Sequence, residues 1–224
     1  MELGLSYIKS LINWGLDIVF PEKCIGCNQK SSILCLTCIT NIRRAERETS
    51  TSIVAAYDYR DPLIKRAIWN LKYYHQKRLG IKLGEMLYDS LLEEVSDLRS
   101  LTKGQPICVI PVPITRNRQK TRGYNQAEII ARGFCESEKS GALNLKKNII
   151  SKKVNTLPQA RITNRIMRLK NIHGAFEINN IPFIKGRTTI VIDDVTTTGG
   201  TMKEIIKLLK EHGAKKVIGF AVAH

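Results

Sequence analysis

Acidic residues are scarce in this chain of 224 residues. Asp and Glu together number 20 against 36 Lys and Arg, which gives a formal net charge of +16. The excess is concentrated in residues 103–173, where fifteen basic and three acidic side chains leave a net charge of +12. A basic surface can serve solubility alone. At this density, however, it favours an anionic partner such as a nucleotide, a diphosphorylated sugar or nucleic acid.

Long apolar runs are absent, so the sequence predicts no membrane span. Residues 1–20 are the most apolar candidate, but Glu2, Lys9, Asn13 and Asp17 interrupt them, and no small-residue cleavage site follows. We interpret them as an amphipathic helix that docks on the body of the protein, and a helix lying on a membrane surface is the less favoured alternative. With no export signal, we expect a cytoplasmic protein. The apolar side of the helix would be formed by Leu5, Ile8, Ile12, Leu16 and either Val19 or Phe20.

Internal repeats and low-complexity linkers are also absent, and hydrophobic residues make up 43% of the chain. This composition is typical of a globular protein with one principal domain. After residue 47, strand and helix patterns alternate to the end, which predicts an α/β fold with a mainly parallel sheet flanked by helices. We expect strands at 52–59, 107–114, 188–194 and 216–224, and helices at 61–73, 79–95, 125–137 and 202–213. Asp61 and Pro62 are suited to open the helix at 61–73, as its N-cap and its first helical residue.

Four of the six cysteines lie close together near the N-terminus. They form two C-x-x-C pairs separated by seven residues, a spacing typical of a tetrahedral zinc site built from four thiolates. Plain packing of buried cysteines and a redox pair are the alternatives. We therefore predict a small zinc module at residues 1–47, followed by the main domain at 48–224. Its ligands would be Cys24, Cys27, Cys35 and Cys38.

The stretch "TTIVIDDVTTTGGTM" at residues 188–202 carries the clearest chemistry. A hydrophobic strand runs into two aspartates, then into a Thr/Gly-rich loop and a helix expected to begin at Met202. Such a loop offers backbone N–H groups, hydroxyls and the positive end of a helix dipole, which together bind a phosphate monoester. Two carboxylates just before it can accept hydrogen bonds from sugar hydroxyls, so the stretch predicts a ribose 5-phosphate site. Its residues are Asp193, Asp194, Thr197, Thr198, Gly199, Gly200 and Thr201.

The same stretch excludes two other phosphate-binding loops, since neither G-x-x-x-x-G-K-[ST] nor G-x-G-x-x-G occurs. It resembles the phosphoribosyl pyrophosphate (PRPP) motif of type I phosphoribosyltransferases. From about residue 20 onward, the chain is similar to the ComF family, which includes competence protein ComFC and GntX-like proteins. Three further segments have counterparts there: the cysteine knuckle, "PVPITRNRQKTRGYNQAEIIAR" and "RLKNIHGAF".

The resemblance implies a type I phosphoribosyltransferase fold and a loop after "ICVIPVP" that holds pyrophosphate with Mg²⁺. Arg118, Arg122 and Gly123 match the family pattern R-x-x-x-R-G-x-N-Q, and Arg116 adds charge to the same loop. Lys72 matches a further family lysine that could reach the pyrophosphate. The segment around residues 157–176 resembles the hood that covers the site, with Arg168 and Asn171 on its R-x-x-N pattern.

A feature that would recognise an acceptor base is missing, as is a glutamine-hydrolysing N-terminal cysteine. Two hypotheses from different classes follow. In the first, the resemblance implies a PRPP-binding competence factor that handles single-stranded DNA during natural transformation, with partners in the competence machinery such as a helicase or a recombination mediator. In the second, the chain is an active phosphoribosyltransferase of nucleotide metabolism or salvage, and its basic surface serves only phosphorylated ligands.

Overall fold

A computed structural model describes residues 22–30, 32–46, 52–153 and 174–224. The chain divides into two compact units between Ile42 and Arg43. The predicted N-terminal helix lies outside the described residues, as do the hood residues Arg168 and Asn171. Among the described residues, no helix is long and apolar enough to cross a membrane.

The larger unit is built on a five-stranded sheet in which every pairing is parallel. The strand order is β1-β7-β6-β2-β3, so β6 lies at the centre. This confirms the predicted parallel α/β fold and adds the short edge strand β3. The strands are β1 (Ile53–Tyr57), β2 (Ile107–Pro111), β3 (Leu143–Leu145), β6 (Thr188–Val195) and β7 (Lys216–Ala223).

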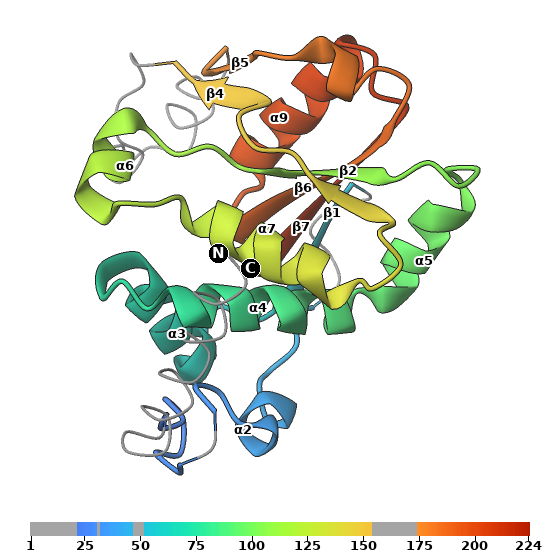
Figure 1. Cartoon of the computed structure of the whole chain (residues 1–224). Coiled ribbons are helices and arrows are strands. Elements are labelled where there is room, and N and C mark those ends of the chain that lie inside the picture. The colour runs from blue at the N-terminus through green and yellow to red at the C-terminus, as the bar shows by residue number, and fades with distance from the viewer. Residues whose placement is uncertain (1–21, 31, 47–51, 154–173) are drawn as a thin grey trace, which may run out of the picture. The chain divides into compact units, whose positions relative to one another are not determined.

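Helices cover both faces of the sheet (Figure 1), with α9 on one face and α4 and α7 on the other. A separate antiparallel pair of strands, β4 (Ile150–Lys152) and β5 (Phe176–Ile178), lies on the α9 side. The helices of this unit are α3 (Pro62–Tyr73), α4 (Lys77–Ser90), α5 (Leu92–Ser100), α6 (Arg116–Arg122), α7 (Gln126–Ser137) and α9 (Gly200–Glu211), with a 3₁₀ turn at Ile181–Phe183.

Two glycines let α4 and α7 approach closely. A Cβ on Gly84 would lie 2.2 Å from the carbonyl oxygen of Ile130, and one on Gly133 would lie 2.2 Å from that of Ile81. No side chain fits such a gap, because both obstacles are backbone atoms of the partner helix. The two helices therefore form one tight layer under the sheet.

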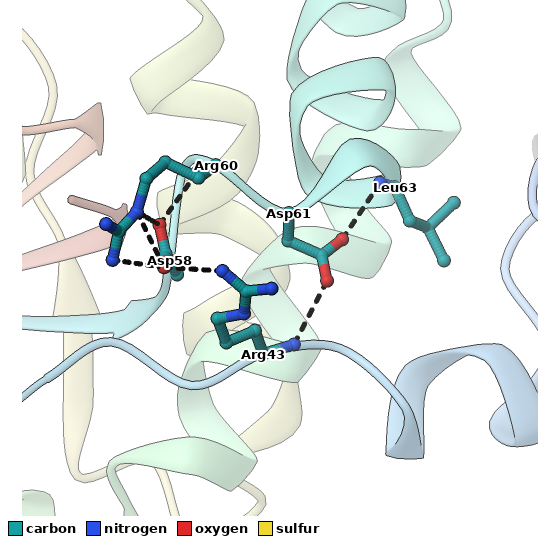
Figure 2. Close-up of polar contacts among 5 residues, drawn as sticks. All are labelled: Arg43, Asp58, Arg60, Asp61 and Leu63. Carbon is teal, nitrogen blue, oxygen red and sulfur yellow. Dashed lines mark hydrogen bonds and ion pairs between the residues drawn. The ribbon is translucent and has the colours of Figure 1, made fainter.

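The start of α3 is anchored by a polar cluster at the carboxyl end of β1 (Figure 2). Asp61 caps the helix, as predicted, because its carboxylate accepts hydrogen bonds from the backbone N–H of Leu63 at 2.9 Å and of Ile64. Its second oxygen accepts from the backbone N–H of Arg43. The nearby carboxylate of Asp58 is buried and accepts three hydrogen bonds from the Arg60 guanidinium, two from Nε and one from Nη2. This cluster sets the position of the helix whose other end carries Lys72 and Tyr73.

Candidate phosphate-binding site

The Thr/Gly-rich loop joins the central strand β6 to α9. Its backbone turns at Gly199, whose φ of +71° is in the left-handed region that favours glycine. The helix begins at Gly200, two residues before the predicted start at Met202. The reason is that the left-handed turn at Gly199 completes the reversal of the chain and leaves Gly200 in helical conformation. The loop glycines therefore form the N-terminus of a twelve-residue helix, where backbone N–H groups lack intrahelical acceptors.

A pocket of about 370 Å³ lies against this helix end. Four segments that are distant in the sequence contribute to it: the end of α3, the β2–α6 region with the start of α7, strand β4, and the β6–α9 loop. Its charged lining residues are Lys72, Arg118, Arg122, Lys152, Asp193 and Asp194. A concave site at the carboxyl ends of parallel strands is where ligands bind in this class of fold.

Most of the predicted site residues meet in this pocket. The whole predicted ribose 5-phosphate set lines it, from Asp193 to Thr201, as do Lys72, Arg118 and Arg122. Arg116 and Gly123 are not among its lining residues. Arg168 and Asn171 lie outside the described residues.

The segment expected as a pyrophosphate loop contains a short helix, α6, and this explains which arginines reach the pocket. The side chain of Thr115 caps the helix by accepting from the backbone N–H of Arg118, and Gly123 ends it with a φ of +73°. Residues four apart lie on one face of a helix, so Arg118 and Arg122 point the same way while Arg116 projects elsewhere. Gly123 lies outside the pocket lining and allows the left-handed turn that ends α6.

The two aspartates differ in their surroundings. Asp194 is buried, and its Oδ2 forms an ion pair with Lys72 Nζ at 2.9 Å. The angles of this contact fall outside hydrogen-bond geometry, so among the described residues Oδ2 has no hydrogen-bond donor. Asp193 is half-buried, and its Oδ1 accepts from the backbone N–H of Asp194. Burial and the neighbouring Asp194 charge raise the pKa of Asp193 to about 7. The pair thus offers acceptors to a ligand's hydroxyl groups.

Lys152 is a pocket residue that the sequence did not reveal. It comes from β4, and its pKa is lowered, first by burial and then by the positive charge of Arg118. In the sequence it is one of two adjacent lysines in "ISKKV", and Lys153 is exposed. Strand alternation could have distinguished Lys152 from Lys153 in the sequence, because it sends neighbouring side chains to opposite faces. An anion in the pocket would compensate the charges that Arg118 and Lys152 bring together.

The outer part of the pocket combines charge with an aromatic ring. Arg122 donates a hydrogen bond to Gln126 Oε1 at 2.9 Å, and its guanidinium carbon lies 5.4 Å from the centre of the Tyr73 ring. Asn125 connects this region to the sheet, because its Nδ2 donates to the Val112 carbonyl and its Oδ1 caps α7. These contacts explain why Asn and Gln follow the arginines in the sequence.

The smaller unit brings the four predicted cysteines together. The Sγ atoms of Cys24, Cys27, Cys35 and Cys38 lie within 4.8 Å of one another. Tetrahedral zinc–thiolate bonds of about 2.3 Å place sulfurs roughly 3.8 Å apart, so the cluster fits a metal ion with small adjustments. Burial raises the pKa of Cys24, but backbone N–H donors, led by that of Cys35, outweigh it and bring the pKa to about 6. The cluster can therefore hold a metal ion such as zinc.

Comparison with known proteins supports the same picture. A family model described as "Phosphoribosyl transferase domain" matches residues 120–224. Competence protein F of Haemophilus influenzae is 30% identical over 154 residues, which cover 67% of this chain and 63% of that protein. The DNA utilization protein YhgH of Escherichia coli O157:H7 is 29% identical over 170 residues, covering 74% of this chain and 68% of that protein.

A shorter part of the chain is similar to an enzyme. Adenine phosphoribosyltransferase of Mycoplasmopsis agalactiae is 41% identical over 90 residues, covering 39% of this chain and 52% of the enzyme. The aligned part thus spans less than two thirds of both the Haemophilus protein and this enzyme. The two competence and DNA-utilization relatives, the phosphoribosyltransferase match and the parallel sheet with its pocket agree with one another. The chain is a ComF-family protein with a phosphoribosyltransferase fold.

Proposed function

We propose that this protein is a cytoplasmic PRPP-binding factor that handles single-stranded DNA during DNA uptake. The observation that carries the proposal is the β6–α9 loop, whose phosphate-binding elements share one pocket with two aspartates and four cationic side chains. A phosphorylated sugar with a diphosphate needs both kinds of group. The DNA role is inferred from the names of the relatives, one a competence protein and one a DNA utilization protein.

In the proposed complex, the loop at Thr197–Thr201 and the N-terminus of α9 bind the 5-phosphate. The carboxylates of Asp193 and Asp194 accept hydrogen bonds from the ribose hydroxyls. Lys72, Arg118 and Arg122 attract the pyrophosphate, with Lys152 as a further cation. Mg²⁺ would enter with PRPP on its phosphate oxygens and neutralise part of their charge. In the smaller unit, Zn²⁺ on the four thiolates has a structural role, and the module boundary at residue 47 stays a prediction.

Calorimetric titration with PRPP, with and without Mg²⁺, tests the pocket. We expect saturable binding that requires Mg²⁺ and is lost when Asp193 and Asp194 are both replaced by Asn. Glu177→Gln is a control, since it removes the charge of an exposed acidic group outside the pocket lining. Absence of heat and of thermal stabilisation at millimolar PRPP in the wild type would disprove PRPP binding.

A second candidate function is phosphoribosyl transfer, favoured by a pocket that retains cationic groups for a pyrophosphate leaving group. Pyrophosphate release from Mg–PRPP, measured with a panel of purine and pyrimidine bases, separates the candidates. Release with one base and no binding of single strands would support the enzyme. Salt-sensitive binding of single strands without pyrophosphate release would support the DNA role.

A further inference from the structure

Three aromatic residues at the carboxyl end of α3 are exposed to solvent. Trp69 is 51% exposed, Tyr73 52% and Tyr74 66%. Residues of this size normally bury most of their surface, and apolar surface gathered at one place marks an interaction site. We therefore expect these exposed aromatic side chains to bind a partner.

Two of these rings and one guanidinium lie together, and we call Trp69, Tyr73 and Arg122 the aromatic ledge. The ring centroids of Trp69 and Tyr73 are 4.4 Å apart, with an angle of 46° between their planes. Arg122 lies over the Tyr73 ring and is held by its hydrogen bond to Gln126. The ledge thus has an ordered cation beside paired aromatic rings.

The charge around the ledge selects the class of partner. Residues 62–84 contain six Lys and Arg and no Asp or Glu. Two of the six, Lys72 and Lys82, form ion pairs with Asp194 and Glu85, and the segment keeps an excess of positive charge. An apolar peptide would gain nothing from this charge, whereas a chain of phosphates would be attracted by it. Exposed aromatic rings interleaved with cations are the elements that bind single-stranded nucleic acid, because every base has a face that stacks.

The ledge is continuous with the pocket, since Tyr73 and Arg122 line both. We propose that the aromatic ledge binds single-stranded nucleic acid by stacking bases on Trp69 and Tyr73, while Arg122 and the exposed lysines Lys65 and Lys77 of α3 and α4 contact phosphates. This inference rests on the proposed DNA role and names the surface that performs it. Trp69 is outside the pocket lining, so its replacement removes no lining residue, although its ring contacts Tyr73, which lines the pocket.

Fluorescence anisotropy with a labelled (dT)20 strand tests the ledge. Trp69→Ala should weaken binding by about 10- to 100-fold, the usual effect of removing one stacking side chain. The matched control is Phe183→Ala. Phe183 is 39% exposed and has Lys146 Nζ 4.6 Å from its ring centre, but it lies in the 3₁₀ turn Ile181–Phe183 and not on α3. The control should bind within about twofold of the wild type.

The salt dependence separates stacking from charge. Trp69→Ala should leave the slope of log affinity against log salt unchanged, because no phosphate contact is lost. Lys65→Gln and Lys77→Gln, both at exposed positions, should each reduce the slope by up to about one. If the lysine variants keep the wild-type slope, or if Trp69→Ala changes it, then the lysines do not contact phosphates or Trp69 does not act by stacking alone.

Tryptophan fluorescence gives a direct readout. The chain has two tryptophans, so Trp14→Phe leaves Trp69 as the reporter. We expect acrylamide to quench Trp69 in the free protein and (dT)20 to protect it. If Trp69 is already shielded in the free protein, another part of the protein covers the ledge and the inference is wrong.

The failure modes are distinct. If the wild type binds (dT)20 and Trp69→Ala binds equally well, the ledge is not the binding surface, although the DNA role stands. If the wild type binds no single strand at all, the ledge and the DNA role both fail. In each case the PRPP titration independently reports on the pocket, and Trp69→Ala should retain wild-type PRPP affinity.

Discussion

Lys72 Nζ lies 2.9 Å from Asp194 Oδ2, and this ion pair joins the end of α3 to the end of β6 inside the candidate pocket. The exposed fraction of the side chain is 19% for Lys72 and 6% for Asp194. Removing one partner of such a pair leaves the other charge buried without compensation.

We therefore expect Lys72→Met to lower the free energy of unfolding by about 2–4 kcal/mol. It should also weaken Mg–PRPP binding by at least about tenfold, since one charge-assisted contact is lost. Urea unfolding and calorimetry measure the two effects. Lys65→Met, at an exposed position of the same helix, should change neither.

The pKa of Asp193 predicts a pH-dependent stability. Because this pKa is raised from 3.8 to about 7, the native protein binds more protons than the unfolded chain between these pH values. Its contribution to stability is present at low pH and is lost as the pH rises through 7. Asp193→Asn removes the effect, so the variant should gain about 2–3 kcal/mol relative to the wild type between pH 5 and pH 8. Urea unfolding at both pH values checks this. The prediction is contradicted if the variant and the wild type differ in free energy of unfolding by the same amount at pH 5 and pH 8.

Lys152 and Lys153 provide a matched pair for the pocket. Lys152→Met should weaken Mg–PRPP binding by about tenfold or more, because a cation of the lining is lost. Lys153→Met changes the same charge at an exposed neighbour outside the lining and should have little effect. Equal losses in the two variants would mean that net charge, rather than contact, determines affinity.

The crossing of α4 and α7 predicts a severe effect of one methyl group. Gly84→Ala places Cβ 2.2 Å from the Ile130 carbonyl oxygen and 2.6 Å from the Phe134 nitrogen, so the helices must separate. We expect a loss of about 3 kcal/mol or more. Gly141→Ala is the control: its Cβ meets no atom within 4 Å, and its φ of +75° costs about 1 kcal/mol. Thermal unfolding compares the two.

The cysteine cluster predicts the metal content. The purified protein should carry about one zinc per chain, measured by elemental analysis, because four thiolates complete one tetrahedral shell. Cys35→Ser should lose most of this metal. Cys135→Ala removes a thiol outside the cluster and should retain it. A full zinc complement in Cys35→Ser would contradict the assignment.

The sequence by itself determined the features whose causes are local. A strand, two aspartates and a Thr/Gly-rich loop occupy consecutive positions, so a candidate phosphate site at the start of α9 could be predicted from local sequence alone. The Asp61 cap depends on neighbours within three residues, and the two C-x-x-C pairs lie within fifteen residues. Alternating periodicities were enough to predict the parallel α/β class.

Only the tertiary structure decided which cations meet those aspartates. Lys72 and Lys152 are 122 and 42 residues away from Asp194. They reach one pocket because the end of α3 and the separate β4-β5 pair both lie beside the end of β6. The helical turn of α6 selects Arg118 and Arg122 over Arg116, which a sequence read as a loop does not reveal. The same holds for the aromatic ledge, since the contact between Tyr73 and Arg122 depends on how the end of α3 lies beside the end of α6.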